Sequence, residues 1–393
     1  MKYSKSILTF ALLLLLKCGY SQNLANEPLS AQVIPAFKSG LNSTDVRTVL
    51  KVVADWQVNT PLNHEPGDWT NGALYAGMVE YAGIAGNESY YKWLRGIADK
   101  LNWTYFIHNN PLRRYHADDY CVGQTYIELY RKYNEKSMIK PIRAYLDQMM
   151  KDPAKGDLKF VNTKDYWSTQ RWSWCDALFM GPTVWAKMGN VTHMKKYLDF
   201  MYSEYKASTD YLYNKEDSLY FRDSSYFIKK EANGEKVFWG RGNGWVFAGL
   251  PIIIRELPAK YKHRDFFVKI YQEMAARLVA LQQPDGSWHA SLLDPASYPN
   301  PEMSATAFFV FGFAWGIDNG YLDKDKYLPA VISGWEAMVS AVWPDGKVGF
   351  IQPVGSDPKT VTREMTEVYG VGGFLLAGTE ICKMIEKGNI INK

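Results

Sequence analysis

Residues 68–78 read Asp68-Trp69-Thr70-Asn71-Gly72-Ala73-Leu74-Tyr75-Ala76-Gly77-Met78, a stretch in which polar residues give way to small and aromatic ones. Similar segments recur five more times along the chain, at intervals of 50 to 65 residues. The six segments are marked by Asp68, Asp118, Asp176, Arg241, Ser304 and Thr366. Recurrence of one kind of segment at a nearly regular interval indicates a repeated structural unit.

Between these segments the sequence predicts amphipathic helices, with charged residues on one face and apolar residues on the other. They cover Val46–Val58, Ser89–Trp103, Lys136–Met150, His193–Tyr205, Asp265–Leu281 and Tyr327–Val342. Because neither kind of helix can bury its apolar surface alone, we expect an all-α fold, an (α/α)6 barrel of six inner and six outer helices. The inner helices would bring their polar and aromatic starts to one rim. An open helical solenoid is the alternative.

Two interruptions of the helical pattern are expected near that rim. Residues 219–227 and 236–239 alternate like strands on either side of Asn233-Gly234, which favours a small β-hairpin with a tight turn. A turn at Pro284–His289 begins a loop that runs to Pro301 and is a candidate wall of a site.

Composition favours a carbohydrate ligand. Hydrophobic residues make up 47% of the chain and charged residues 22%, which is typical of a globular protein. Aromatic residues make up 15%, with 14 Trp and 27 Tyr, and such side chains suit stacking on sugar rings. The alternative is that the aromatic residues fill a large core.

Residues 1–21 resemble an export signal, because a lysine-containing start precedes the apolar run Ile7–Leu16, which is too short to span a bilayer. Cleavage would leave residues 22–393 as a single domain, periplasmic or secreted. Lipid anchoring through Cys18 is the alternative, but Lys17 fits that signal poorly. The cleaved segment carries three lysines and no acids, so the net charge falls from +4 to +1. We therefore expect no nucleic-acid partner and no membrane attachment.

Three cysteines remain after cleavage, Cys121, Cys175 and Cys382, with no Cys-x-x-Cys pair. A disulfide between Cys121 and Cys175 is conceivable, but we expect buried free thiols. The six histidines form no i, i+4 pair, so no metal site is predicted.

Asp176 is the strongest candidate for an acid catalyst. It follows Trp172 and Trp174 and precedes Phe179 and Met180. Apolar surroundings disfavour the ionised carboxylate and raise its pKa, so that the group can still hold a proton near neutral pH. The alternative is a helix-capping role.

Asp118 and Asp119 are candidates for a second carboxylate. If neighbouring inner helices run the same way, their first turns lie side by side, with axes roughly 8–10 Å apart. Adjacent residues on a helix point about 100° apart, so only one of the two can face the cavity. We favour Asp118, because Asp118, Val122 and Leu129 continue an inward stripe. Both residues could instead cap the helix.

Arg241 lies in the run Trp239-Gly240-Arg241-Gly242-Asn243-Gly244-Trp245, where three glycines leave space around a guanidinium flanked by two indoles. A guanidinium can bind a carboxylate with two hydrogen bonds. Phosphate binding is disfavoured, because no Lys-Ser or Lys-Thr follows the glycines. We expect Arg222 to add positive potential at the rim, together with Arg113 and Arg114, for which a surface position is the favoured alternative.

The sequence resembles glycoside hydrolase families 88 and 105, the unsaturated glucuronyl and rhamnogalacturonyl hydrolases. The matching runs are Asp68–Gly72, His116–Asp119 with Gly123-Gln124, Trp174–Met180, Arg241–Trp245 and Val368–Gly370. They cover the mature chain almost from end to end, and the runs at Asp176 and Arg241 are fairly specific.

The resemblance implies an (α/α)6 barrel that removes a 4,5-unsaturated uronic acid from the non-reducing end of oligosaccharides left by polysaccharide lyases. It implies that Asp176 protonates the C4=C5 bond and activates a water, that Asp118 or Asp119 assists, and that no cofactor is required. We expect the anionic oligosaccharide to contact Arg241, Trp245, Trp69, Asn71, His116, Trp174, Arg222 and Trp239. Some members carry a histidine where this chain has Arg222, which would suit a more anionic neighbouring sugar, such as a sulfated one.

Two other functions remain open from the sequence. One is an inverting glycosidase or a polysaccharide lyase on the same barrel, and the other is a glycan-binding protein without turnover. The identity of the second sugar, the preference between glucuronyl and galacturonyl groups and the oligomeric state are not predicted.

Overall fold

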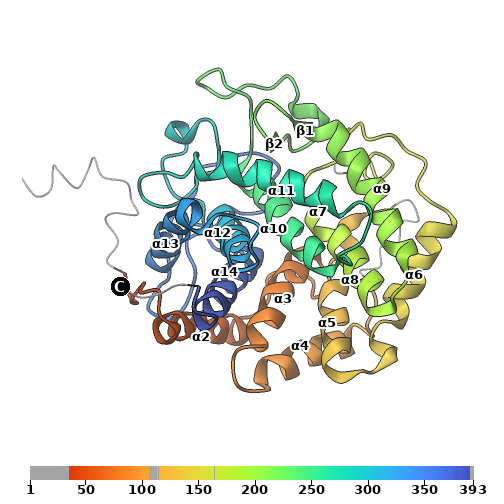
Figure 1. Cartoon of the computed structure of the whole chain (residues 1–393), viewed down its shortest axis with the longest axis horizontal. Coiled ribbons are helices and arrows are strands. Elements are labelled where there is room, and N and C mark those ends of the chain that lie inside the picture. Colours follow the sequence, from red (N-terminus) through yellow and green to blue (C-terminus); the bar gives the residue numbers. More distant parts are fainter. Residues whose placement is uncertain (1–34, 106–112, 114, 163, 390–393) are drawn as a thin grey trace, which may run out of the picture.

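The computed structural model describes residues 35–105, 113, 115–162 and 164–389. The export signal expected at residues 1–21, Cys18 and Arg114 lie outside this part of the chain. The described residues form two concentric rings of helices (Figure 1). The inner ring consists of α3 (Trp69–Ala82), α5 (Gly123–Tyr133), α7 (Ala177–Met180) with α8 (Pro182–Thr192), α10 (Gly240–Glu256), α12 (Met303–Asp318) and α14 (Val368–Glu386). The outer ring consists of α2 (Ser43–Asn59), α4 (Ser89–Lys100), α6 (Lys140–Lys151), α9 (Lys195–Leu212), α11 (Arg264–Val279) and α13 (Lys324–Ser340).

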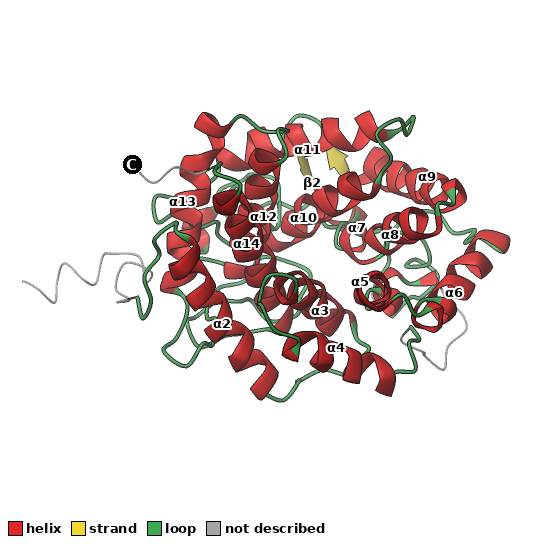
Figure 2. Ribbon diagram, turned by 60° about the horizontal axis from the view of Figure 1, so that its bottom comes forward, coloured by secondary structure: helices red, strands yellow, loops and turns green. Residues whose placement is uncertain are grey.

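The inner ring is closed. Each inner helix contacts the next one along the chain, and α14 contacts both α12 and α3, so the last inner helix packs beside the first. Each of α2, α4, α9, α11 and α13 packs against an inner helix from outside. The ring is also visible in the second view, where helices account for nearly all regular structure (Figure 2). The expectation of an (α/α)6 barrel is confirmed, and the open solenoid is excluded.

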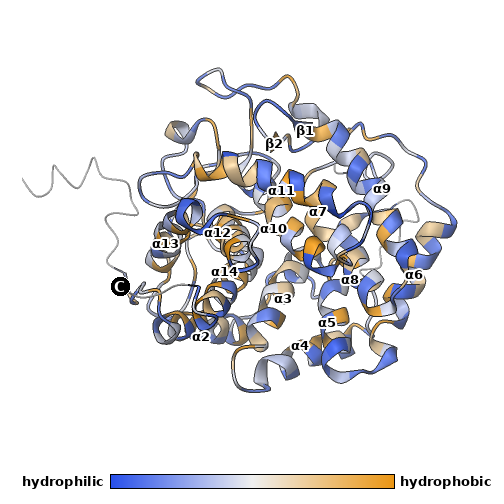
Figure 3. Cartoon of the chain, in the orientation of Figure 1, coloured by the Kyte–Doolittle hydropathy of each residue, from blue (hydrophilic) through white to orange (hydrophobic). Residues whose placement is uncertain are grey.

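The two rings differ in composition because they differ in burial. In α2, Asn42 caps the helix by accepting from the Asp45 backbone NH, and the buried residues form one stripe that includes Val46, Val49 and Val53. In α12, by contrast, residues 303–317 are all buried. Figure 3 accordingly shows much apolar colour on α12 and mixed colour on the outer helices. The apolar α14 is long enough to cross a membrane, but 89% of its apolar window is buried in the barrel.

Small residues let inner helices touch through their backbones. A Cβ atom at Gly77 of α3 would lie 2.0 Å from the carbonyl oxygen of Gly372 in α14, and one at Gly372 would lie 2.3 Å from the carbonyl oxygen of Ala73. Contacts this short exclude any side chain unless a helix moves. The glycines therefore close the ring at the seam between its first and last helices.

Two inner helices begin differently from the expectation. Asp118 lies in a 3₁₀ turn, η3 (Ala117–Tyr120), and α5 starts only at Gly123. The third inner helix is divided into α7 and α8 at Gly181, because Pro182 lacks a backbone NH and starts a new helix. Asp118 and Asp176 therefore lie on short irregular segments at the rim.

The small hairpin is present, but it lies earlier than expected. Strand β1 (Tyr213–Asn214) pairs antiparallel with β2 (Leu219–Tyr220). Beyond β2, the Asp223 side chain accepts from the Ser225 NH and starts a 3₁₀ turn, η5 (Ser224–Tyr226), which ends the strand. Around Asn233-Gly234 a single bridge joins Lys230 and Lys236, and Gly234 has a φ of +86°.

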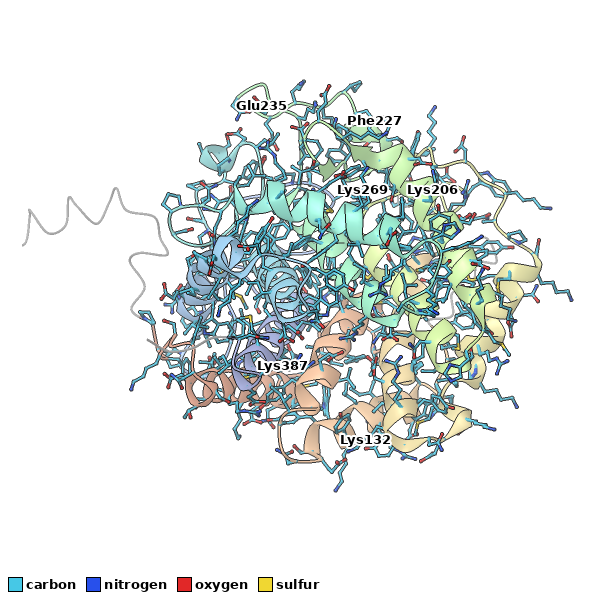
Figure 4. All side chains as sticks on the ribbon, viewed as in Figure 1. Lys132, Lys206, Phe227, Glu235, Lys269 and Lys387 are labelled. Atoms are coloured by element: carbon cyan, nitrogen blue, oxygen red, sulfur yellow. The ribbon has the colours of Figure 1, made fainter. Side chains whose placement is uncertain are left out.

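This segment forms an edge of the molecule. In the view with all side chains, Phe227 and Glu235 lie at its margin, whereas side chains fill the space between the two rings (Figure 4). The segment then leads directly into α10.

Candidate active site

A pocket of about 320 Å³ opens at the rim where the inner helices begin. It is lined by Trp69, Asp118, Trp174, Asp176, Met180, Arg222, Val354, Gly355 and Ser356. These residues come from the starts of three inner helices, from the segment after β2 and from the loop before α14. The structure therefore brings Asp118, Asp176 and Arg222 together, as the shared rim predicts.

Asp176 lies just before α7 and is buried in the wall of the pocket, which Trp174 and Met180 also line. Its side chain makes no capping hydrogen bond, so the helix-capping alternative is not supported. The Cys175 thiol donates to Asp176 Oδ2 over 3.4 Å. Burial raises the pKa of the Asp176 carboxyl above its usual range, and the Arg222 and Arg241 guanidinium groups oppose this rise in part.

Asp118 and Asp119 face different surroundings, as expected for neighbours on a helical turn. Asp119 is buried and accepts from Arg113 Nε over 3.0 and 3.2 Å. Burial raises the pKa of Asp119 to about 7, against the attraction of Arg113. Asp118 instead lines the pocket. Burial raises its pKa well above the usual range, Arg113 opposes the rise, and the Asp119, Asp68 and Asp176 carboxyl groups add to it.

Arg222 is the cation that faces Asp176. Its Nε lies 3.8 Å from Asp176 Oδ2, and its NH1 donates to Asp223 Oδ2 over 2.6 Å. The Phe160 ring covers the guanidinium, 4.7 Å from its Cζ. The backbone holds this segment against the acid, because the Cys175 NH donates to the Arg222 carbonyl over 2.8 Å.

Arg241 does not lie where the glycine-rich run suggests. Its side chain is only 1% exposed and is not among the residues that line the pocket. NH1 donates to the Gln352 carbonyl over 2.5 Å and NH2 to the Pro353 carbonyl over 3.1 Å. The guanidinium lies between the Trp239 and Tyr369 rings, at 4.4 and 4.8 Å. In this structure Arg241 supports the loop that carries one wall of the pocket.

The remaining predicted residues divide into a wall and a layer behind it. Trp69 and Trp174 line the pocket. His116 lies behind Trp174, with ring centroids 4.7 Å apart, and its Nδ1 is 3.6 Å from Asp118 Oδ2. Trp245 is fully buried and packs edge-on against Trp69, with centroids 6.0 Å apart. These two contacts hold the aromatic wall in place.

Trp239 and Asn71 are also buried and have structural partners. The Trp239 indole NH donates to Gln352 Oε1 over 3.2 Å. The Asn71 amide donates to the His64 and Glu65 carbonyl oxygens over 3.1 and 3.0 Å. Neither residue lines the pocket.

Sequence reasoning missed the wall formed by Val354, Gly355 and Ser356 and placed a wall at 284–301 instead, whose residues do not line this pocket. The signal was weak, because the loop between α13 and α14 carries no run of aromatic or charged residues. Gln352 fixes the position of this loop. Its backbone NH donates to Glu302 Oε1 over 3.0 Å, and its side-chain amide donates to the Asp357 carbonyl over 2.9 Å.

The cysteines match the expectation of buried free thiols. Cys121, Cys175 and Cys382 are all buried and form no disulfide. Within the described ranges, no group of three or more His, Cys, Asp or Glu side chains gathers as metal ligands do.

Comparisons with known proteins agree with this geometry. The model of Glycosyl Hydrolase Family 88 matches residues 44–385. An unsaturated 3S-rhamnoglycuronyl hydrolase of Alteromonas sp. (strain LOR) is 38% identical over 80% of this chain and 77% of its own length. An enzyme of the same description from Formosa agariphila is 35% identical over 89% of this chain and 93% of its own length.

Solved structures show the same fold. A protein described as a polysaccharide lyase is 31% identical, with a TM-score of 0.80, over 89% of this chain and 99% of its own. A glycosyl hydrolase family 88 protein from Bacteroides vulgatus is 32% identical, with a TM-score of 0.78, over 87% and 99%. Since the family model spans the whole barrel and relatives more than 30% identical cover most of it, the chain belongs to glycosyl hydrolase family 88.

Proposed function

We propose that this glycoside hydrolase removes a 4,5-unsaturated uronic acid from sulfated, rhamnose-containing oligosaccharides of the kind released from ulvan by a lyase. Removal of an unsaturated uronate is the activity of the family. What we propose for this chain in addition is that the sugar next to the uronate is a sulfated rhamnose. The names of the Alteromonas and Formosa relatives support it. The observation that carries the chemistry is Asp176, a buried acid in the wall of the rim pocket.

The reaction needs an acid that can protonate carbon. The C4=C5 bond is an enol ether, and a proton from Asp176 adds to C4 and leaves a cation at C5 that the ring oxygen stabilises. Water then adds at C5 and returns a proton to the Asp176 carboxylate. The resulting hemiketal opens to a ketone, and the hemiacetal at C1 releases the next sugar. A group that gives a proton and takes one back acts best when its pKa is near the working pH, which burial of Asp176 favours.

The second carboxylate has a different part. Asp118 lines the same pocket, and burial and neighbouring carboxyl groups keep its pKa high. A neighbouring carboxylate disfavours ionisation, so the Asp176 carboxyl group adds to the rise in the pKa of Asp118. We assign Asp118 to orienting the attacking water or a sugar hydroxyl. Trp69 and Trp174 supply flat apolar walls for the sugar ring.

The test is a direct assay with lyase-digested ulvan, compared with lyase-digested rhamnogalacturonan and glycosaminoglycan fragments. The ultraviolet absorbance of the conjugated double bond should fall fastest with the ulvan fragments. A rise in absorbance on intact polysaccharide would instead identify a lyase, which the structural likeness to a described lyase makes the second candidate. Affinity without any change in the oligosaccharide would identify a binding protein.

We also propose that the mature enzyme is exported as a single domain after loss of residues 1–21. The apolar run Ile7–Leu16 behind a lysine-containing start supports this proposal. Expression in a bacterium, followed by fractionation and sequencing of the mature amino terminus, tests it. Retention of Met1 on a cytoplasmic product would contradict it.

A further inference from the structure

Arg222 has a donor that the protein does not use. NH1 donates to Asp223, but Nε is buried and has no hydrogen-bond partner within the described structure. A buried NH without an acceptor costs free energy, so such a group in a pocket wall points to a ligand that supplies the acceptor. Arg222 is also the one cation among the described residues that line the pocket.

The other arginines near the pocket differ from Arg222. Arg113 directs its guanidinium at Asp119 from both Nε and NH2. Arg241 keeps its Nε unbonded, but two aromatic rings cover it and it does not line the pocket. Among these arginines, Arg222 alone combines a donor without an acceptor with a place in the pocket wall.

The charges around Asp176 make Arg222 its main attractive partner. Arg222 Nε lies 3.8 Å from Asp176 Oδ2, and Arg241 acts from farther away and through its own hydrogen bonds. The titratable and charged groups that act on Asp176 from the elements around it are Cys175, Arg222, Arg241, Asp118 and Tyr369, and Asp223 pairs with Arg222 behind them. Of these, the two arginines and the Cys175 thiol, which donates to Asp176 Oδ2, favour the ionised form of Asp176, and Arg222 has the largest effect of the three.

We infer that Arg222 is the receptor for a negatively charged oxygen of the substrate, and that binding of this anion releases Asp176 from Arg222. The inference rests on the proposed function, because it assigns the anion and the timing of protonation in that same pocket. When the substrate anion pairs with Arg222, the positive charge no longer favours ionised Asp176, and Asp176 takes one proton from solvent. The fraction of Asp176 that carries its proton is thereby greater in the complex with substrate than in the free enzyme.

Comparing two pH profiles of the wild-type enzyme tests the timing. The profile of kcat/KM reports the acid in the free enzyme, and the profile of kcat reports it in the complex. The alkaline limb of kcat should lie at higher pH than that of kcat/KM by about one unit or more, the size that one charge at this distance produces. Coincident limbs in an active enzyme would overturn the inference.

Variants at position 222 test the receptor. In Arg222→Gln the limb of kcat/KM should move to higher pH and close the gap, and kcat/KM should fall about tenfold to a hundredfold. Arg222→Lys keeps the charge and should keep the wild-type limb while recovering part of the affinity. Arg95→Gln, on the outer helix α4, removes an exposed arginine paired with Glu135 and should change neither profile. A purely structural Arg222 would instead lower activity without moving the limb.

The source of the anion is resolved with two substrates. Unsaturated disaccharides with and without a sulfate on the second sugar both carry the uronate carboxylate. If the gap between the two limbs appears with both, Arg222 binds the carboxylate, and if it appears only with the sulfated one, Arg222 binds the sulfate. The absence of a gap with either substrate counts against the inference.

Calorimetry separates failure of this inference from failure of the proposed function. D-Glucuronate and inorganic sulfate are titrated into the protein in two buffers of different ionisation enthalpy, which measures proton uptake without turnover. One of these anions should bind the wild type with net proton uptake, and Arg222→Gln should lose both binding and uptake. Binding without proton uptake, equal binding by the variant, or no binding of either anion would overturn the inference, even in an active hydrolase. Proton uptake in a protein that hydrolyses no unsaturated uronide would instead refute only the proposed function.

Discussion

Asp176→Asn replaces the buried acid by an amide of nearly the same shape. The amide has no acidic proton, so the step that adds a proton to C4 loses its donor. Positioned acids contribute about 10²–10⁴ in rate, and because Asp118 is assigned to orienting water or a sugar hydroxyl we expect kcat to fall by about 10³ or more. At about 1.4 kcal/mol per factor of ten, this corresponds to at least about 4 kcal/mol of activation free energy.

The same substitution should not weaken the fold. Burial raises the pKa of Asp176 in the folded state, so above a pH of about 4, where the unfolded chain ionises, the folded state binds more protons. The contribution of Asp176 to the free energy of unfolding therefore falls as pH rises from about 4 to the pKa of the folded state. The fall is about 1.4 kcal/mol for each pH unit in this range. A neutral amide avoids this loss. The variant should match the wild type below pH 4 and equal or exceed it at pH 7.

Two measurements on one preparation decide the matter. Loss of absorbance of the unsaturated sugar gives kcat, and urea unfolding at pH 3.5 and pH 7 gives the free energy of unfolding. Near wild-type turnover would refute the role of Asp176 as the acid. A variant that is inactive and also much less stable at pH 7 would refute the claim that the folded state disfavours the charge.

Other consequences of the structure can be measured separately. Gly77→Ala should lower the free energy of unfolding by about 3 kcal/mol, because the new Cβ meets a backbone carbonyl, whereas Gly96→Ala on α4, which meets open space, should raise it by about 0.5–1 kcal/mol in urea unfolding. Arg241→Met should raise KM about tenfold and lower the free energy of unfolding by about 2 kcal/mol, since the Pro353 carbonyl loses its arginine donor and the Gln352 carbonyl keeps only the Tyr369 hydroxyl; an unchanged KM would mean that the wall does not depend on this residue. A thiol reductant should leave the melting temperature unchanged, because Cys121 and Cys175 are free, and a clear decrease would reveal a disulfide.

The sequence predicts the barrel well because the barrel depends on local composition. Segments rich in small residues at a regular interval imply helices that crowd around an axis, and the contact of α14 with α3 follows once six are present. That only one of Asp118 and Asp119 would line the pocket was also predictable, since neighbours on a helical turn cannot face the same cavity. In both cases the features that carry the prediction, the composition of one segment and the angle between two neighbouring residues, are local in the sequence.

The partners of Arg241 could not be predicted, because they lie 111 and 112 residues away in a loop without a recognisable pattern. A guanidinium flanked by indoles suits a substrate carboxylate and a pair of backbone carbonyls equally well. Only the fold decides between them, by bringing the loop that begins at Gln352 over α10. Arg222 was expected to contact the substrate from the resemblance, but its distance to Asp176 and its unused NH are visible only in the fold.

The seam between Gly77 and Gly372 has a consequence for how the protein is made. Nearly three hundred residues separate the two glycines. The contact that closes the ring can therefore form only late in synthesis, after α14 has left the ribosome. Until α14 emerges, the nascent chain is an arc with the apolar flanks of α3 and α12 uncovered, a state prone to aggregation. Synthesis of this enzyme should therefore depend on chaperones that hold the growing chain until its last helix is complete.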